Sequence, residues 1–413
     1  MTTKTRYDIF LNTPATGQVH AADCVVEEDS GLVTRVAFRY QDNYLDQEAA
    51  FPLEPRKLPL VAGETLLRCR AGIPAFIDDY LPDAWGRRVL TRLAFYRDRQ
   101  RFNANSVIDS LSLLGRSRIG ALSIVLHGTE PHFEPGHSME TLARAERVAQ
   151  LVDGSHLDEV DLNEMSLIYL AGAGTGVGGA RPKALLYDGD GQYLAKFNRL
   201  GQDTYNNARV ELACLDMASA AGIDVGGGKI VAGINGREVL LLNRFDIAPD
   251  GRRYHLITAN GLLKEPDTQR DPGGAFRYDD ICSLLRLHSI SIDTDLQQLL
   301  RLMLFNRAIN NTDDHERNFS LIHRGSGYQF SPAYDMVPNT AMGEYHAAGF
   351  GYQPYPPTPA EVQGLGKVFG IGKGRVAQAA EQVIGAVSRW PDFAEKAGVS
   401  EVESDRLARC FHV

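Results

Sequence analysis

The chain has 413 residues, of which 44% are hydrophobic and 23% are charged, and its formal net charge is −9 at pH 7. The hydrophobic and charged fractions are typical of globular proteins and exclude the fibrous and disordered classes. The acidic balance argues against a broad nucleic-acid surface, because such surfaces depend on clustered Lys and Arg. Any association with DNA is therefore expected to run through a partner protein.

The length predicts two or three packed subdomains, at about 100–200 residues each. No stretch approaches the ~18–20 uncharged apolar residues of a membrane-spanning helix, and the N-terminal segment lacks the apolar core of a signal peptide. The five cysteines are widely spaced and contain no Cys-x-x-Cys pair, which favours reduced thiols over a disulfide framework or a cysteine zinc site. These features predict a cytoplasmic protein without a membrane partner.

The N-terminal region, residues 1–150, is predicted to be rich in β-structure. Short apolar segments such as Asp23–Val26 and Val33–Tyr40 alternate with Gly, Asp and Pro, which is typical of strands joined by turns. The run Phe76–Gly86 contains Pro82 and is predicted to be a structural turn before a basic helix. A charged run over residues 137–161 indicates a helix and linker, and marks the end of this region.

The central region, residues 151–248, is predicted to form a small β-sheet with one helix. Its Gly-rich stretch Leu170–Lys183 precedes two strands, Ala184–Tyr187 and Gln192–Phe197, around a turn at residues 188–191. Apolar residues from Val210 to Ala221 then recur at helical spacing, with Gly222 placed to end that helix, and a second strand pair follows at residues 229–234 and 238–245.

The C-terminal region, residues 249–413, is predicted to be mostly helical. Leu296–Ile309 is apolar on most sides, as expected of a buried helix, and residues 372–384 form an amphipathic helical pattern. A β-rich lobe followed by a helical lobe suggests a nucleotide bound between the two.

The most informative motif is Asn310–Asn318, directly after the predicted buried helix. Asp313 and Asn318 are 318 − 313 = 5 positions apart, the separation of the base and the metal-binding Asn in a protein-kinase catalytic loop. A strand–turn–strand pattern follows, and its return strand is expected to bring Asp335 back toward Asn318.

These residues match the demands of phosphoryl transfer. Mg²⁺ requires hard oxygen ligands, which Asn318 and Asp335 offer, while Asp313 is the predicted base that receives the proton of the substrate hydroxyl. Asp314 competes with Asp313 for the role of base, and His315 either contacts the nucleotide or metal or supports its own loop. The alternative interpretation of the whole motif is a polar loop that ends a helix.

The sequence motif predicted to bind the phosphates of the nucleotide is less specific than the Asp313–Asn318 motif. The glycines of residues 172–183 allow backbone N–H groups to approach phosphates, and Arg181 and Lys183 add positive charge, although no Walker A loop is present. A flexible surface loop is the alternative. Lys196 lies in the middle of a predicted strand, where Glu211 is a possible partner; an exposed Lys and a solvated Glu are the alternative.

At these residues the chain resembles the HipA family, bacterial Ser/Thr kinases that act as the toxin of a toxin–antitoxin pair. The matching motifs span most of the chain in the family's order: Phe76–Gly86, Gly178–Lys183, Lys196–Phe197, Glu211, Arg244–Asp246, Asn311–Asn318 and Pro332–Asp335.

The resemblance implies an α+β fold, a bilobal protein-kinase-like arrangement with an extra N-terminal β-rich subdomain, a small nucleotide-binding lobe and a helical C-terminal catalytic lobe. It implies ATP and Mg²⁺ as cofactors. The implied nucleotide-binding residues are Gly178, Gly179, Ala180, Arg181, Lys183, Lys196, Asn243, Phe245, His315, Asn318, Tyr334 and Asp335.

The resemblance also implies partners. They are a protein substrate such as an aminoacyl-tRNA synthetase, and a small DNA-binding HipB-like antitoxin through which the complex reaches DNA indirectly. The alternatives are a nucleotide-binding co-repressor or scaffold that works with the antitoxin without turnover, and a small-molecule kinase. Two departures stand out: Asn243 occupies a hinge position that is often Glu in the family, and Thr175 is the only hydroxyl residue of the Gly-rich loop, where the family is known to autophosphorylate a Ser.

Overall fold

The computed structural model describes residues 2–98, 102–153, 181–199, 203–234, 236, 238–268, 276–340 and 345–413. The chain forms two compact units. Unit 1 comprises Met1–Arg199, Arg244–Asp271 and Ile322–Gly327, and unit 2 comprises Leu200–Asn243, Pro272–Leu321 and Tyr328–Val413. The predicted division into 1–150, 151–248 and 249–413 follows the chain order and stays a prediction, whereas each unit combines segments far apart in sequence.

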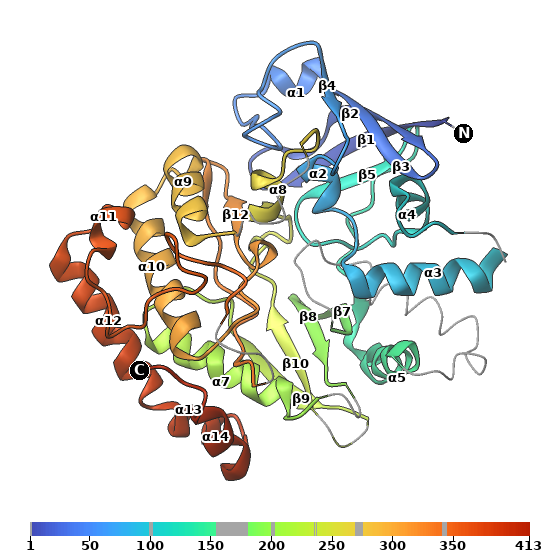
Figure 1. The fold of residues 1–413 in the computed structure, drawn as a ribbon. Helices are drawn as coiled ribbons and strands as arrows, with labels where there is room; N and C mark the ends of the chain where they lie inside the picture. The colour runs from blue at the N-terminus through green and yellow to red at the C-terminus, as the bar shows by residue number, and fades with distance from the viewer. Residues whose placement is uncertain are drawn as a thin grey trace. The chain divides into compact units, whose positions relative to one another are not determined.

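Unit 1 opens with an antiparallel five-stranded sheet in the order β4-β3-β2-β1-β5, whose long strands lie side by side in Figure 1. Tyr7, Ile9 and Leu11 alternate along β1 and are all buried, so one face of the sheet packs into the core. The prediction of a β-rich N-terminal region is confirmed. The strands are β1 (Thr2–Thr13), β2 (Gly17–Asp29), β3 (Leu32–Tyr40), β4 (Glu64–Arg68) and β5 (Leu122–Leu126).

The run Phe76–Gly86 forms the predicted turn and starts a helix. The Asp83 carboxylate accepts a hydrogen bond from the Gly86 N–H (2.8 Å) at the first turn of α3 (Ala84–Asp98), and Trp85 is fully buried. Just before it, the Asp79 carboxylate accepts hydrogen bonds from the N–H and the hydroxyl of Thr258, at 2.7 and 2.6 Å. The motif thus ties the turn before α3 to the last residue of β11 (His255–Thr258).

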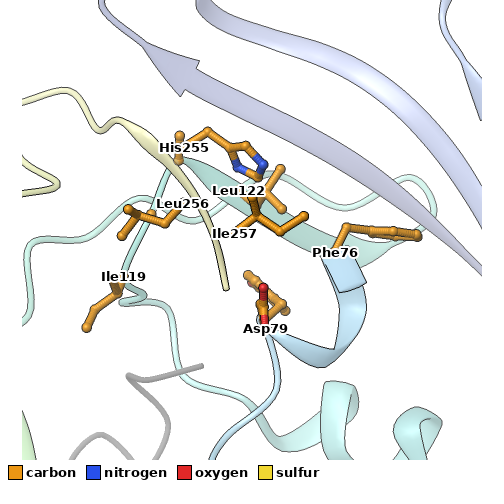
Figure 2. A pocket seen from close by; sticks show the side chains of 10 residues that line it. Phe76, Asp79, Ile119, Leu122, His255, Leu256 and Ile257 are labelled. Atoms are coloured by element: carbon orange, nitrogen blue, oxygen red, sulfur yellow. The ribbon is translucent and has the colours of Figure 1, made fainter. Parts of the chain in front are cut away.

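A small cavity lies beside this turn. Its lining includes Phe76, Asp79 and His255, whose side chains Figure 2 shows around it. The cavity measures about 20 Å³, which is room for roughly one water molecule and not for a nucleotide. We therefore interpret it as a packing feature of unit 1. The short helices of this unit are α1 (Asp42–Leu45), α2 (Ala75–Asp78), α4 (Val107–Leu113) and α8 (Ala259–Leu263).

The predicted hairpin after the Gly-rich stretch is present in unit 1. β7 (Lys183–Asp188) pairs antiparallel with β8 (Gly191–Phe197), with the turn where the sequence placed it, and β6 (His137–Ser138) pairs parallel with β7. The predicted helix and linker near residue 137 correspond in part to α5 (Leu142–Asp153).

In unit 2, α7 (Asn207–Ala220) packs against β9 (Gly228–Ala232) and β10 (Glu238–Asn243). The Asn206 side chain accepts a hydrogen bond from the Arg209 N–H and caps the start of α7, while Gly222 (φ 78°) follows its end, as predicted. The predicted helix and strand pair are confirmed.

The rest of unit 2 is mostly helical, which confirms the prediction for this region. The prediction of a buried helix at Leu296–Ile309 is confirmed by α10 (Ile292–Ala308), most of whose side chains are buried. The other elements of the C-terminal region are α9 (Tyr278–His288), β12 (Ser320–His323), β13 (Tyr328–Phe330), α11 (Leu365–Phe369), α12 (Lys373–Val387), α13 (Trp390–Lys396) and α14 (Glu401–Ala408).

Within the described ranges, no helix is both long enough and apolar enough to cross a membrane. All five cysteines lie in those ranges and are free thiols.

A buried ion pair stabilises unit 1 at the segment after β10. Arg244 donates to both carboxylate oxygens of Asp246, at 3.0 and 2.7 Å, and the Gly120 N–H donates to the same carboxylate at 2.7 Å. Burial alone would raise the pKa of Asp246, but the charge of Arg244 and these hydrogen bonds outweigh it and lower the pKa below its usual value.

We expect Asp246→Asn to destabilise the protein by about 3 kcal/mol, because it leaves the guanidinium of Arg244 buried without a counter-charge. The measurement is a thermal melt. Asp250→Asn is the matched control, since the Asp250 carboxylate and its partner Arg252 are exposed, and its melting temperature should equal that of the wild type. Equal melting temperatures for both variants would contradict a stabilising role of the pair.

Candidate active site

The candidate site of unit 2 is built on the loop that follows α10. The helix ends at Ala308, and Asn310 then adopts a positive φ of 56°, a conformation that Asn tolerates better than most residues. The chain turns there, and the loop continues to the short 3₁₀ helix Glu316–Asn318. The motif predicted from the sequence therefore does follow a buried helix.

The return of the chain brings Asp335 to this loop. The Ser331 N–H donates to the Ser320 carbonyl (2.9 Å), and the Tyr334 hydroxyl donates to the carbonyl of Arg317 (2.9 Å). The Asn311 amide donates to the backbone carbonyl of Asp335 at 3.3 Å. Asp335 has a φ of 57°, a strained conformation for an Asp that persists only where its surroundings hold it.

Asn318 is oriented by its neighbour in the loop. Its Nδ2 donates to the backbone carbonyl of Asp313 (2.8 Å), so the other end of the amide, Oδ1, is directed away from that contact. Oδ1 is buried and has no hydrogen-bond partner among the described residues. An amide oxygen held in this way is a suitable ligand for a hard cation such as Mg²⁺, which prefers oxygen ligands.

The two consecutive aspartates have different surroundings. The Asp314 side chain is fully buried and accepts three hydrogen bonds, from Tyr278 Oη (2.8 Å), His346 Nδ1 (3.0 Å) and the Ala348 N–H (3.1 Å). The Asp313 side chain is 76% exposed. Only Asp313 is accessible to a substrate hydroxyl, so the geometry favours Asp313 over Asp314 as the candidate base.

The pKa of Asp313 is raised above its usual value. The loss of surrounding water and the negative charges of Asp335 and Asp314 raise it, while His315 lowers it. Because the side chain is largely exposed, we give more weight to the neighbouring carboxylates than to the loss of water. Asp335 itself is held at the loop through its backbone carbonyl, which accepts the hydrogen bond from Asn311.

A chain of buried hydrogen bonds connects the loop to α10 and α9. Asn311 donates to Asn306 of α10 (3.0 Å), Asn306 donates to Tyr278 of α9 (3.0 Å), and Tyr278 donates to Asp314. Sequence reasoning missed Tyr278 and Asn306, which lie outside the motif. Asn306, a polar residue inside a helix predicted to be buried, is the signal in the sequence that could have pointed to this network.

His315 lies beside the candidate base. Its Nε2 is 4.0 Å from Asp313 Oδ1 and its side chain is 29% exposed. This position fits both alternatives, contact with a ligand or support of the loop, and the nucleotide contact stays a prediction.

Part of the motif predicted to bind phosphates lies outside the described residues. The residues concerned are Thr175, Gly178, Gly179 and Ala180. Arg181 and Lys183 are described. The Lys183 ammonium lies 2.6 Å from the Asp83 carboxylate, and both side chains are almost fully buried. The sequence did not indicate this ion pair, which provides Lys183 with an anionic partner inside unit 1. A phosphate contact of Lys183 stays a prediction.

The remaining predicted residues lie in the last residues of strands or in the segments that follow strands. Lys196 of β8 is buried and faces Lys183 in the β-sheet register. Asn243 ends β10 with an exposed side chain, and its N–H donates to the Gly227 carbonyl (3.1 Å). Phe245 is half-buried, and Tyr334 is buried. The nucleotide contacts of these four residues stay predictions, as does the Lys196–Glu211 pair.

Comparison with known proteins identifies the class to which this fold and loop belong. A model of the HipA-like C-terminal domain matches residues 175–391, and a model of the HipA N-terminal domain matches residues 8–125. The C-terminal match alone covers more than half of the chain. The protein therefore belongs to the HipA family.

Two relatives extend this comparison. The solved complex of HipA, HipB and operator DNA from a toxin–antitoxin system of Shewanella oneidensis MR-1 contains a chain with a TM-score of 0.67 and 18% identity, covering 98% of this chain and 94% of that one. It confirms the predicted HipA-like α+β fold. "Putative kinase Y4mE" of Sinorhizobium fredii is 27% identical over 194 residues, 46% of this chain, and the match spans 40% of that relative's length.

We expect Asp314→Asn to destabilise the protein by about 1–3 kcal/mol, because an amide presents an N–H₂ group to donors that now contact a carboxylate. Tyr278→Phe removes two hydrogen bonds, the one donated to Asp314 and the one accepted from Asn306, and should cost about 1–3 kcal/mol. Thermal melts measure both effects. The matched control is Asp405→Asn on the exposed face of α14, which should melt like the wild type. A wild-type melt for Asp314→Asn would show that the buried carboxylate does not hold the loop.

Proposed function

We propose that the protein is an ATP- and Mg²⁺-dependent Ser/Thr protein kinase that acts as the toxin of a toxin–antitoxin pair. The observation that carries the proposal is the loop of unit 2, where the carboxylate of Asp313 is exposed, the amide of Asn318 is oriented by the Asp313 carbonyl, and the backbone of Asp335 is hydrogen-bonded to Asn311. An accessible base next to oxygen ligands for a cation is the arrangement that phosphoryl transfer requires.

In this proposal the oxygen of a substrate hydroxyl attacks the γ-phosphorus of ATP, and the bond from that phosphorus to the β–γ bridging oxygen breaks. Asp313 accepts the hydroxyl proton and holds the hydroxyl in line for attack. Asn318 Oδ1 and the carboxylate of Asp335 would hold Mg²⁺, which neutralises the charge of the phosphates when it is bound. Asp314 and Tyr278 position the loop without touching the substrate.

The proposed partners follow from the family. The Shewanella oneidensis relative was solved together with HipB and operator DNA, so we infer a HipB-like antitoxin as the partner of this chain, with DNA reached indirectly. The net charge of −9 supports an indirect contact, since the chain carries an excess of acidic groups. The proposed substrate is a cytoplasmic protein such as an aminoacyl-tRNA synthetase.

We expect Asp313→Asn to lower phosphate transfer from labelled ATP to proteins of a cell lysate by at least about 100-fold, because a positioned base contributes roughly 10²–10⁴-fold. Autoradiography of the lysate with Mg²⁺ present measures the transfer. Asp405→Asn, an exposed carboxylate of unit 2, should transfer label like the wild type.

Transfer by Asp313→Asn at the wild-type level would refute the proposed role of Asp313. Absence of transfer to any protein by the wild type would favour a co-repressor or scaffold, and repression by Asp313→Asn together with the antitoxin would strengthen that alternative. Label on a small metabolite alone would indicate a small-molecule kinase.

The pH dependence tests the environment of the base separately. Asp313 must be deprotonated to act, and its pKa is raised, so activity should fall on the acid side at a higher pH than for an ordinary Asp, whose pKa is about 3.9. His315 lowers this pKa, so His315→Gln should move the acid limb of kcat to still higher pH. The profile is measured at saturating ATP to remove any effect on nucleotide binding. An unmoved acid limb would show that His315 does not act on the charge of Asp313.

A further inference from the structure

A group of metal-ligating side chains gathers on the outer face of the N-terminal sheet, in unit 1. Asp8 of β1 and Asp23 of β2 are direct cross-strand partners, so their side chains are on the same face. The opposite face carries the buried residues Tyr7 and Ile9. Two like charges placed opposite each other are unfavourable unless a cation or proton lies between them.

A β-bulge adds a histidine to this face. The register of β1 and β2 shifts between Ile9 and Phe10, so that Ile9 pairs with Ala22 whereas Phe10 pairs with His20. Without the extra residue, His20 and Asp23 would project from opposite faces, because they are three positions apart. The bulge therefore turns His20 toward the aspartates, and its ring stacks on Phe10 with centroids 4.7 Å apart.

Each carboxylate is held by one oxygen and presents the other to the histidines. Asp8 Oδ2 accepts from the Gly128 N–H (2.8 Å), and Asp8 Oδ1 lies 2.7 Å from His127 Nδ1 and 3.8 Å from His20 Nε2. Asp23 Oδ2 accepts from Arg6 (2.7 Å), and Asp23 Oδ1 lies 2.9 Å from His20 Nε2. Carboxylates that bind a metal through one oxygen are commonly fixed in this way through the other.

His20 Nε2 and Asp23 Oδ1 lie 2.9 Å apart, the distance of an ion pair. Both atoms are buried, and among the described residues neither makes a hydrogen bond. Ligand atoms of Asp8, His20 and Asp23 all lie within 4.8 Å of one another, so they face a common point. A histidine that served only to neutralise the aspartates would be expected to donate a hydrogen bond to one of them.

We propose that Asp8, His20 and Asp23 form a binding site for a divalent transition metal, with Zn²⁺ as the best match, and that His127, which contacts Asp8 Oδ1, supplies the fourth ligand by turning its ring toward the cation. Zn²⁺ takes imidazole nitrogen and carboxylate oxygen in fourfold coordination, whereas Mg²⁺ and Ca²⁺ select oxygen ligands alone. The bound cation joins β1, β2 and the residue after β5, and so ties together three strands of the sheet.

Metal binding at this site displaces protons. The proton between His127 Nδ1 and Asp8 Oδ1 leaves to solvent, and both atoms turn their lone pairs to the cation. His20 binds through Nε2 in its neutral form.

The experiment uses the full chain, stripped of metal and then dialysed against Zn²⁺ in the presence of excess Mg²⁺, which occupies oxygen-only sites. We expect one Zn²⁺ per chain and a higher melting temperature with Zn²⁺ than without it. His20→Gln and Asp23→Asn should each weaken Zn²⁺ binding by at least about tenfold. His132→Gln, a histidine of the same unit outside the cluster, and Asp335→Asn in unit 2 should bind Zn²⁺ like the wild type.

A second measurement does not depend on any variant. Cu²⁺ bound to the wild type should show coupling to two imidazole nitrogens in its electron paramagnetic resonance spectrum, from His20 and His127. Retention of no Zn²⁺ by the wild type, wild-type affinity in both His20→Gln and Asp23→Asn, or a Cu²⁺ spectrum without nitrogen coupling would overturn the proposal. Since the readouts are metal content and spectra, the result is independent of the proposed kinase activity.

Discussion

The candidate active site depends on one buried carboxylate, that of Asp314. A charged group without water is costly unless donors surround it, and its three donors come from α9 and from the segment at residues 346–348. The loop after α10 is therefore fixed where these donors converge. The side chain of Asp313, one position earlier in the sequence, is exposed to solvent. The same constraint thus explains both the rigidity of the loop and the accessibility of its candidate base.

Strained backbone conformations also occur at the candidate active site. Among the described residues, three non-glycine positions have positive φ, and two of them, Asn310 and Asp335, border the candidate site. Each costs free energy on the order of 1–3 kcal/mol that the surrounding contacts must offset. Side-chain amides supply such contacts: Asn310 donates to the carbonyl of Asn339, and Asn311 to that of Asp335. Strain held in this way is common where reacting groups must be placed before the substrate arrives.

The histidine and aspartate cluster of the N-terminal sheet is formed by the pairing of strands and not by a local sequence motif. Its members are separated in sequence by as many as 119 positions, and Asp8 and His127 meet only because β1 and β5 are neighbours in the sheet. The extra residue of the bulge is Ala21 of β2, because Ile9 pairs with Ala22 and Phe10 with His20. In the sequence it shows only as two consecutive small apolar residues, Ala21 and Ala22, which do not specify a bulge. A period of two predicts which residues share a face only as long as the register is unbroken.

The sequence by itself determined the order of strands and helices, the buried helix before the polar loop, and the spacing of Asp313 and Asn318, because periodicity and turn residues are local properties of the chain. It also indicated the family through its motifs. Only the tertiary structure showed that Asp313 is exposed and Asp314 buried, revealed the pairing of Lys183 with Asp83, and placed Tyr278 in contact with Asp314. Each of these outcomes depends on how a charged side chain is surrounded by residues that are far from it in the sequence. No local sequence pattern contains that information.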